Sequence, residues 1–223
     1  MSVNPQLSVR IDTETVRQRV LSNIIKMMFH RGWIKEENLE NKTKKAINDA
    51  NDENLYKIKL DVKLGSFPTY EYQNTDEKTD FNDDTVFVKL VPQKVTSVSK
   101  SPIIVDFLTN YKQSHKILIV DEMSDKSRNT LMTNKYVEVF SEKKILQCIL
   151  NHVLSPAYQI LTPDECVAVL KEYQLTRRQM KIMFDIDPVA QYLFLKKGRI
   201  VRIIRNSEAS GYAIDYRIVV HKN

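Results

Sequence analysis

The sequence predicts an α+β protein, and the two parts of the 223-residue chain carry that prediction in different ways. In residues 1–150, segments with helical spacing of apolar residues alternate with segments typical of strands. In residues 151–223, helix start signals come first and β-branched residues dominate the end. We therefore expect a layered N-terminal domain with a small mixed sheet, residues 1–150, and a small C-terminal α+β domain, residues 151–223.

The N-terminal part opens with an amphipathic helix. Asp12 or Thr13 is its expected cap, and the helix should end near Gly32. One face is apolar, formed by Val16, Val20, Ile24, Met27 and Met28. Residues 35–53 are highly charged, which predicts a loop plus a short exposed helix.

The strands of the first sheet are expected further along. Residues 85–91 alternate in character and stop at Pro92, as an edge or half-buried strand does. Residues 116–121 are almost continuously apolar, which is typical of a central strand covered on both faces. Residues 136–140 predict another strand, and residues 103–110, preceded by Pro102, predict a helix. Residues 71–84 hold six acids against one lysine and indicate a loop.

The C-terminal part contains three helix start signals. Residues 162–165, Thr-Pro-Asp-Glu, and residues 176–179, Thr-Arg-Arg-Gln, are capping boxes, and Asp187-Pro188 starts a third helix that should end by Gly198. Two strands, joined through residues 206–211, are expected to follow. Because these caps and turns are all local, we expect residues 151–223 to fold without the rest of the chain.

The first of those strands has an unusual pattern. Neither of its faces is purely apolar: one carries Ile200, Arg202 and Ile204, and the other carries Arg199, Val201, Ile203 and Arg205. Five basic residues and no acid lie between positions 196 and 205. Two interpretations stay open: arginines that extend past both rims of a sheet to reach water, or a strand against a second chain, where arginines pair with carboxylates or carbonyls.

An ordered series of motifs in this region resembles one family. The series is Asp187-Pro188-Val189-Ala190, Leu195-Lys196-Lys197-Gly198, Ile203-Ile204-Arg205, Ser207-Glu208, Ser210-Gly211 and Tyr216-Arg217. It resembles the fifth subunit of DNA-dependent RNA polymerases, which eukaryotic polymerases I, II and III share and which has a counterpart in the archaeal enzyme. The likeness extends weakly to Arg31-Gly32-Trp33, where the family has a helix ending in Arg-Gly-aromatic.

The resemblance implies a non-catalytic polymerase subunit. Residues 1–150 would correspond to the family's jaw domain, which projects beside downstream double-stranded DNA, and residues 151–223 to its assembly domain, which docks on the largest subunit. The interface residues that it implies are Pro188, Gly198, Arg202, Arg205, Ser207, Glu208, Tyr216 and Arg217. Departures at residues 152–158, at Met180-Lys181 and at Ile186 indicate a divergent member, with a viral origin open.

A second expected site lies at residues 124–128. The matching loop and helix start face downstream DNA in the family. Asp125 is the expected N-cap, so that Lys126, Ser127 and Arg128 fall in the first helical turn, where amides and cations bind phosphate. The alternative is a solvated helix start, because the Asp125 carboxylate repels an anion.

Two other functions compete with this interpretation. A stand-alone DNA-binding module is disfavoured by the modest formal charge of +6, since such proteins carry a stronger basic stripe. A metal-dependent nuclease would need an acid and an (Asp/Glu)-x-Lys pair; the candidates are Asp61, Asp121 and Asp76-Glu77-Lys78. Arg177-Arg178 resembles a phosphate clamp, although solvated arginines at a helix start are the commoner case.

The remaining features set the context. Cys148 and Cys166 lie in apolar runs without metal-ligand spacing, which favours reduced core thiols over a disulfide. We expect no signal peptide and no apolar span long enough for a membrane. We expect a nuclear protein, or a cytoplasmic or virion protein if viral. We expect no catalytic residues, cofactor, metal, small-molecule substrate or membrane partner.

Overall fold

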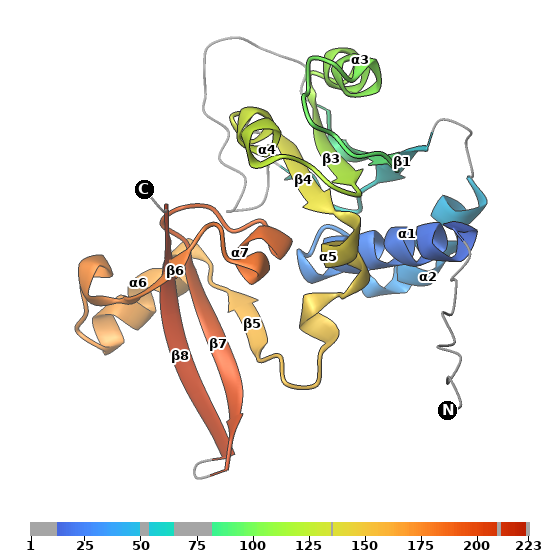
Figure 1. Ribbon diagram of the computed structural model, residues 1–223. Coiled ribbons are helices and arrows are strands. Elements are labelled where there is room, and N and C mark those ends of the chain that lie inside the picture. Colours follow the sequence, from blue (N-terminus) through green and yellow to red (C-terminus); the bar gives the residue numbers. More distant parts are fainter. Residues whose placement is uncertain (1–12, 50–53, 65–81, 135, 209–210, 222–223) are drawn as a thin grey trace, which may run out of the picture.

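A computed structural model describes residues 13–49, 54–64, 82–134, 136–208 and 211–221, and it contains two four-stranded sheets with helices around them (Figure 1). The elements in chain order are α1 (Thr13–His30), α2 (Glu36–Asn48), β1 (Leu55–Lys59), β2 (Asn82–Val91), α3 (Pro102–Asn110), β3 (Ser114–Val120), α4 (Asp125–Met132), β4 (Val137–Ser141), α5 (Glu142–Leu146), the 3₁₀ turn η2 (Ile149–Asn151), β5 (Ala157–Ile160), α6 (Pro163–Glu172), the 3₁₀ turn η3 (Arg177–Gln179), β6 (Lys181–Phe184), α7 (Pro188–Tyr192), β7 (Ile200–Ser207) and β8 (Gly211–Val220). The α+β fold class is confirmed.

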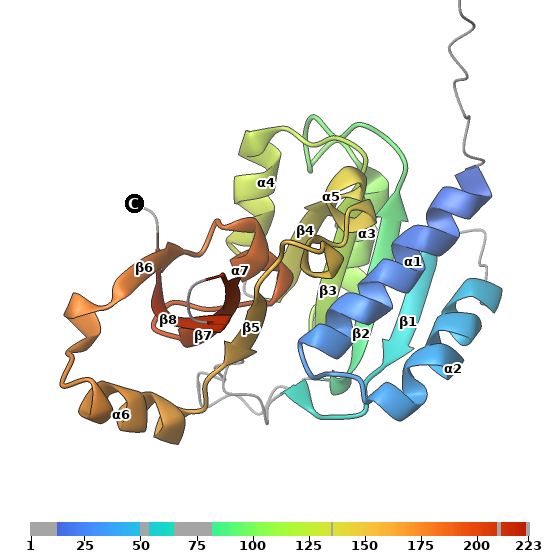
Figure 2. The same ribbon diagram turned by 90° about the horizontal axis from the view of Figure 1, so that it is seen from below.

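The first sheet has the strand order β1-β2-β3-β4. β1 is antiparallel to β2, whereas β2, β3 and β4 are parallel. α1 and α2 cover one face, and α3 and α4 cover the other (Figure 2). All seven residues of β3 are buried, so the prediction of a central strand covered on both faces is confirmed.

The N-terminal helices follow the apolar pattern. α1 begins at Thr13 and ends at His30, as predicted, and buries Val20, Ile24, Met27 and Met28. The short exposed helix expected within residues 35–53 is present, but it is longer than predicted, because α2 occupies thirteen of these residues. Packing of Ala46 and Leu39 against the core stabilises this charged helix beyond what its composition indicates. Residues 71–81 of the predicted acidic loop lie outside the described residues.

The second sheet has four strands, in the order β5-β7-β8-β6, whereas the sequence predicted two. The capping box at Thr176 is present, but it closes only the short turn η3, and residues 181–184 form β6 instead of continuing a helix. β6 pairs in parallel with β8, and this pairing buries Met183. The other two start signals are confirmed: α6 has its capping box at Thr162, and Asp187 caps α7.

The two faces of β7 explain its mixed sequence. Ile200 packs in a cluster with α6, whereas Val201 and Ile203 pack in the cluster that contains α1 and α7. The first residues of β7 are therefore covered on both faces, whereas Arg202 is partly exposed and Arg205 is exposed.

The predicted division of the chain falls in η2, between the two sheets. We call residues 13–150 the N-terminal module and residues 151–221 the C-terminal module. One apolar cluster nevertheless spans both, since it joins Met27 and Trp33 to Ala190, Phe194 and Val201. Independent folding of residues 151–223 stays a prediction. A separate C-terminal module would expose the apolar side chains that this shared cluster buries.

Candidate functional site

The hairpin formed by β7 and β8 projects away from the rest of the molecule and carries most of the predicted interface residues (Figure 1). Its two faces differ. Arg202 and Tyr216 are cross-strand partners on the face that α6 partly covers; Arg202 Nε donates to Tyr216 Oη over 3.2 Å, and Arg202 Nη1 donates to Gln159 Oε1 over 3.2 Å. Arg205 and Arg217 lie on the opposite face.

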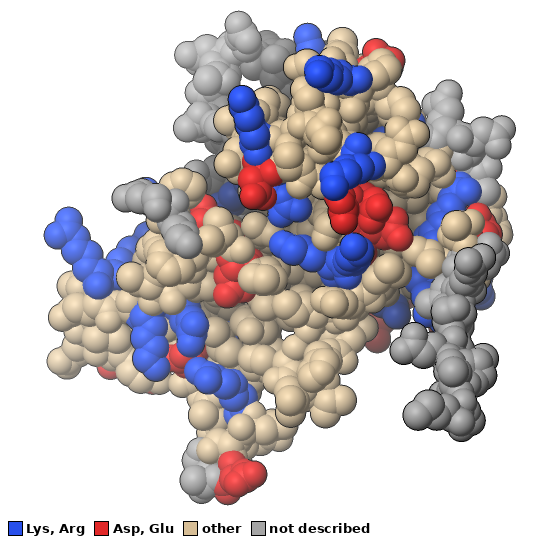
Figure 3. All heavy atoms as spheres, in the orientation of Figure 1, with Lys and Arg blue, Asp and Glu red and all other residues tan. Residues whose placement is uncertain are grey.

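That opposite face is organised around Asp215. Its carboxylate lies 2.9 Å from Lys181 Nζ, 3.1 Å from an Arg205 nitrogen and 3.4 Å from Arg217 Nε. Burial alone would raise the pKa of Asp215, but hydrogen bonds from Lys181 and Arg217 lower it below its ordinary value. Figure 3 shows basic side chains gathered over the hairpin, with little acidic surface between them. Three cations surround one carboxylate, so the face keeps an excess of positive charge.

The other predicted interface residues lie at the turn of the hairpin and in the segment before its first strand. Glu208 is exposed at the turn of the hairpin and Ser207 precedes it. Pro188 is the first residue of α7, and Gly198 lies before β7 with φ of +87°, a conformation that favours glycine. Gly198 N also donates to Val219 O over 2.8 Å, which fixes the start of the hairpin. The eight residues therefore do not form one patch.

Exposed apolar side chains accompany the charges, and the sequence analysis missed them. Tyr212 and Ile214 of β8 are 71% and 57% exposed, and Ile182 of β6 is 55% exposed. The register places all three on the face of the sheet that also holds Arg202. Their spacing of two along β8 was the available signal, because alternate apolar residues in a strand share a face.

The predicted DNA-contact residues lie at the start of α4, with two corrections. The N-cap is Ser124, not Asp125: the Ser124 hydroxyl accepts from Ser127 N. The Ser127 side chain is buried and its hydroxyl donates to Thr96 O over 2.9 Å, so it faces the protein and not solvent. Serine is the better cap here because its hydroxyl also donates to Thr96 O and thereby ties the helix start to the preceding loop.

Lys126 is exposed and Arg128 is partly exposed, and other basic residues adjoin them. Burial, and then the charge of Arg128, lower the pKa of Lys144 on α5, so these two cations lie close together. Lys94 and Lys143 both pair with Glu122, at 2.9 and 3.8 Å. The basic surface thus includes α5, which the sequence analysis did not connect with α4 because the two elements are separated by β4.

A buried polar cluster joins the two modules. Both Arg31 terminal nitrogens donate to the Glu138 carboxylate over 2.7 Å, and Arg31 Nε donates to Tyr192 O over 2.7 Å. His115 Nε2 lies 2.6 Å from Glu138 Oε1. Burial alone would raise the pKa of Glu138, but Arg31 and His115 hold it at about 2. Arg31 is thus bonded both to β4 of the N-terminal module and to α7 of the C-terminal module.

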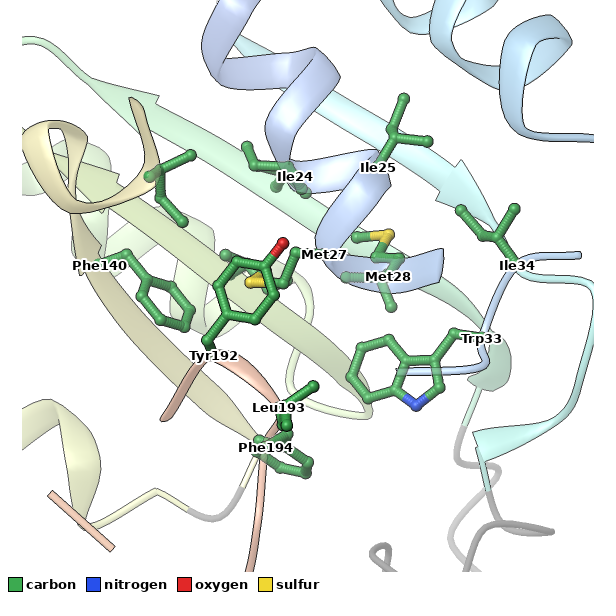
Figure 4. Close-up of a cluster of buried hydrophobic side chains, with 14 of the residues drawn as sticks. Ile24, Ile25, Met27, Met28, Trp33, Ile34, Phe140, Tyr192, Leu193 and Phe194 are labelled. Atoms are coloured by element: carbon green, nitrogen blue, oxygen red, sulfur yellow. The ribbon is translucent and has the colours of Figure 1, made fainter. Parts of the chain in front are cut away.

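Aromatic rings surround this cluster. The Arg31 guanidinium lies 4.7 Å from the centre of the Trp33 ring and 5.4 Å from that of Phe194. Figure 4 shows Trp33, Met27 and Met28 from the first module facing Tyr192, Leu193 and Phe194 from the second. Residues 31–33 were predicted to be a helix end with a weak likeness to the family, and in the structure Arg31 and Trp33 hold the two modules together.

The nuclease candidates do not converge in the described part of the chain. Asp61 accepts from Lys42 Nζ over 2.6 Å and from Lys35 N over 2.9 Å, which engages both of its oxygens. Asp121 follows β3 on another part of the surface, and residues 76–78 lie outside the described residues. Over the described ranges, no group of three or more potential metal ligands occurs, and no helix is long and apolar enough to span a membrane. Cys148 and Cys166 are buried and unpaired, as predicted.

Comparison with known proteins points to one family. The model for "RNA polymerase Rpb5, C-terminal domain" matches residues 148–219, which include the second sheet up to the last residue but one of β8. "DNA-directed RNA polymerase subunit 5" of Acanthamoeba polyphaga mimivirus is 34% identical over 160 residues, covering 69% of this chain and 78% of the relative. The RPABC1 subunit of RNA polymerases I, II and III of Caenorhabditis elegans is 27% identical over 220 residues, covering 94% and 98%. The chain therefore belongs to the Rpb5 family, the fifth subunits of DNA-directed RNA polymerases.

Proposed function

We propose that this subunit docks on the largest polymerase subunit through its C-terminal module and holds its N-terminal module beside downstream DNA. The observation that carries the proposal is the β7–β8 hairpin. It lies in the family-matched region and projects from the molecule. One of its faces exposes Tyr212 and Ile214 on the side that holds Arg202, and the opposite face carries Arg205 and Arg217. Aromatic and arginine side chains are enriched in protein interfaces, where they supply much of the binding energy. The subunit itself contributes contacts and not catalysis.

Purification of a tagged copy from cells that make the polymerase tests this function. We expect the tagged chain to elute with the large catalytic subunits, in the nuclear fraction, or in the cytoplasm and virion if the enzyme is viral. A stand-alone DNA-binding module or a nuclease would instead elute as a single small protein. Elution without catalytic chains, under conditions that keep the polymerase intact, would contradict the proposal.

The basic surface at α4 and α5 is the proposed DNA contact. Lys126→Ala with Arg128→Ala should weaken retention of downstream DNA regardless of sequence, because phosphate contacts carry no base information. The slope of log affinity against log salt concentration should fall by roughly one or two phosphate contacts. The measurement is the lifetime of elongation complexes over a series of salt concentrations. Lys171→Ala with Arg178→Ala removes the same charge from exposed positions of the other module and serves as the matched control.

A competing interpretation of α4 stays open, because Asp125 is exposed beside the two cations and repels phosphate. An unchanged salt slope in the Lys126 and Arg128 variant would favour that interpretation, in which the helix start is merely solvated. A slope that changes as much in the control variant would also contradict a local contact, since it would reflect net charge alone.

A further inference from the structure

The outer edge of the first sheet is formed by β1. The bonds Leu60 N to Asp84 O and Leu90 N to Asn54 O, at 2.7 and 3.0 Å, show that even-numbered residues of this strand face β2. Because antiparallel pairing alternates, the backbone N–H and C=O groups of Leu55, Lys57 and Lys59 face away from the sheet. Lys59 O already accepts from Lys42 Nζ, so β1 presents chiefly the outward backbone groups of Leu55 and Lys57 to another strand.

A groove of about 540 Å³ runs beside this edge. α2 forms one wall through Lys42, Lys45, Ala46 and Asp49. Phe87 and Tyr111, whose rings stack 4.1 Å apart, lie on the other side. The volume lies within the usual range for binding sites, and it is bounded on both flanks as an added strand requires.

The charges of the groove favour an acidic occupant. Lys42 is already engaged, since its Nζ donates to Asp61 Oδ1 and to Lys59 O. The other described lysines that line the groove are Lys45, Lys57 and Lys59. Apart from Asp61, the only acid among the described lining residues is Asp49. Lys57 and Lys59 share one face of β1 at a spacing of two. Lysines at an edge also oppose pairing with a second copy of the same edge, because like charges would lie opposite each other.

We propose that the β1 edge binds an extended segment of another polypeptide as an added strand, and that this segment alternates carboxylates with apolar residues. Carboxylates on one face of the segment pair with Lys57 and Lys59. Apolar side chains on its other face contact the side of β1 that carries Tyr56 and Ile58, beside α2. The backbone bonds of the added strand provide affinity, and the alternation provides specificity. This site is separate from the hairpin and from α4, so it does not depend on the proposed polymerase contacts.

The test uses the full chain and a fluorescent, end-capped octapeptide of alternating valine and glutamate, with binding followed by anisotropy. We expect saturable binding, and none for the matching valine–lysine peptide. Lys57→Glu with Lys59→Glu should weaken binding at least tenfold. Lys57→Pro should do the same through the backbone, because it removes an outward N–H that the β1–β2 ladder does not use. Lys44→Glu, on α2 outside the groove, is the control for a charge reversal close to the edge.

Two results would overturn the proposal. The first is the absence of saturable binding to the wild-type chain. The second is equal binding by the Lys57→Pro and Lys44→Glu variants at unchanged melting temperatures, which would mean that charge acts without strand addition. If Lys57→Pro lowers the melting temperature, an octapeptide methylated on alternate backbone nitrogens provides the same test on the wild-type chain, and undiminished binding of that peptide would overturn the proposal.

Discussion

Arg31→Met is expected to lower the free energy of unfolding by about 3–5 kcal/mol, because it leaves the buried Glu138 carboxylate without its cation. It also removes the hydrogen bonds to Tyr192 O and Gln191 O, which join the two modules. For a protein of this size, the loss corresponds to a fall in melting temperature of about 10 °C. Calorimetry measures it. Arg31→Lys should be intermediate, since lysine keeps the charge but lacks the planar fork of donors that Arg31 uses for Glu138 and Tyr192 O.

Two controls separate this effect from a general loss of charge. Arg19→Met removes an exposed arginine from the same helix and should change stability by less than about 0.5 kcal/mol. Adding Glu138→Gln to Arg31→Met should restore part of the loss, because the uncompensated carboxylate is then gone. An Arg31→Met protein as stable as Arg19→Met would contradict the role assigned to the cluster.

The same cluster predicts an acid dependence. The folded-state pKa of Glu138 is about 2, against an ordinary 4.5. A carboxyl group with a lowered folded-state pKa contributes stability that is complete above pH 4.5 and is lost as the pH falls toward 2. The wild-type protein should therefore lose more stability across this interval than Glu138→Gln. Parallel curves for the two proteins would show that Glu138 is not held ionised by its neighbours.

The sequence predicted elements whose stability depends on local pattern. α1, β3 and the capped start of α6 fall where periodicity, continuous apolar character and a capping box place them. β5 and β6 were not predicted, because each has only four residues and depends on pairing with a distant strand. Arg31 shows the same limit more clearly: its carboxylate partner lies 107 residues away, and no local signal connects them.

The candidate site was predicted in part. Arg202 and Arg205 lie on opposite faces of their strand, as predicted, but their pairings with Tyr216 and Asp215 of the neighbouring strand were not predicted. Asp215 was absent from the prediction because its role depends on cross-strand neighbours. Ser127 was placed with two solvent-facing cations, whereas the turn directs its hydroxyl inward to Thr96. Residue type and spacing identified the hairpin, but the sheet register decides which residues act together.

Arg205→Ala with Arg217→Ala is expected to release the subunit from the polymerase while leaving it folded. The proposed docking would remove these cations and Asp215 from water, and truncating one side of such a desolvated pair costs about 2–5 kcal/mol in affinity. That cost corresponds to a weakening of about 30-fold or more. The isolated variant should keep its fold, because both arginines lie at the surface of the hairpin. Arg177→Ala with Arg178→Ala makes the same charge change on η3, where both residues are exposed, and should not affect assembly.

The most direct measurement is the affinity of the full chain for the largest subunit, determined side by side for the wild-type protein and the two double variants. Our account predicts that the wild-type protein and the Arg177 and Arg178 variant bind alike, and that the Arg205 and Arg217 variant binds at least about 30-fold more weakly with an unchanged melting temperature. Equal affinities for all three proteins, or no binding of the wild-type chain to the largest subunit, would contradict docking through the hairpin.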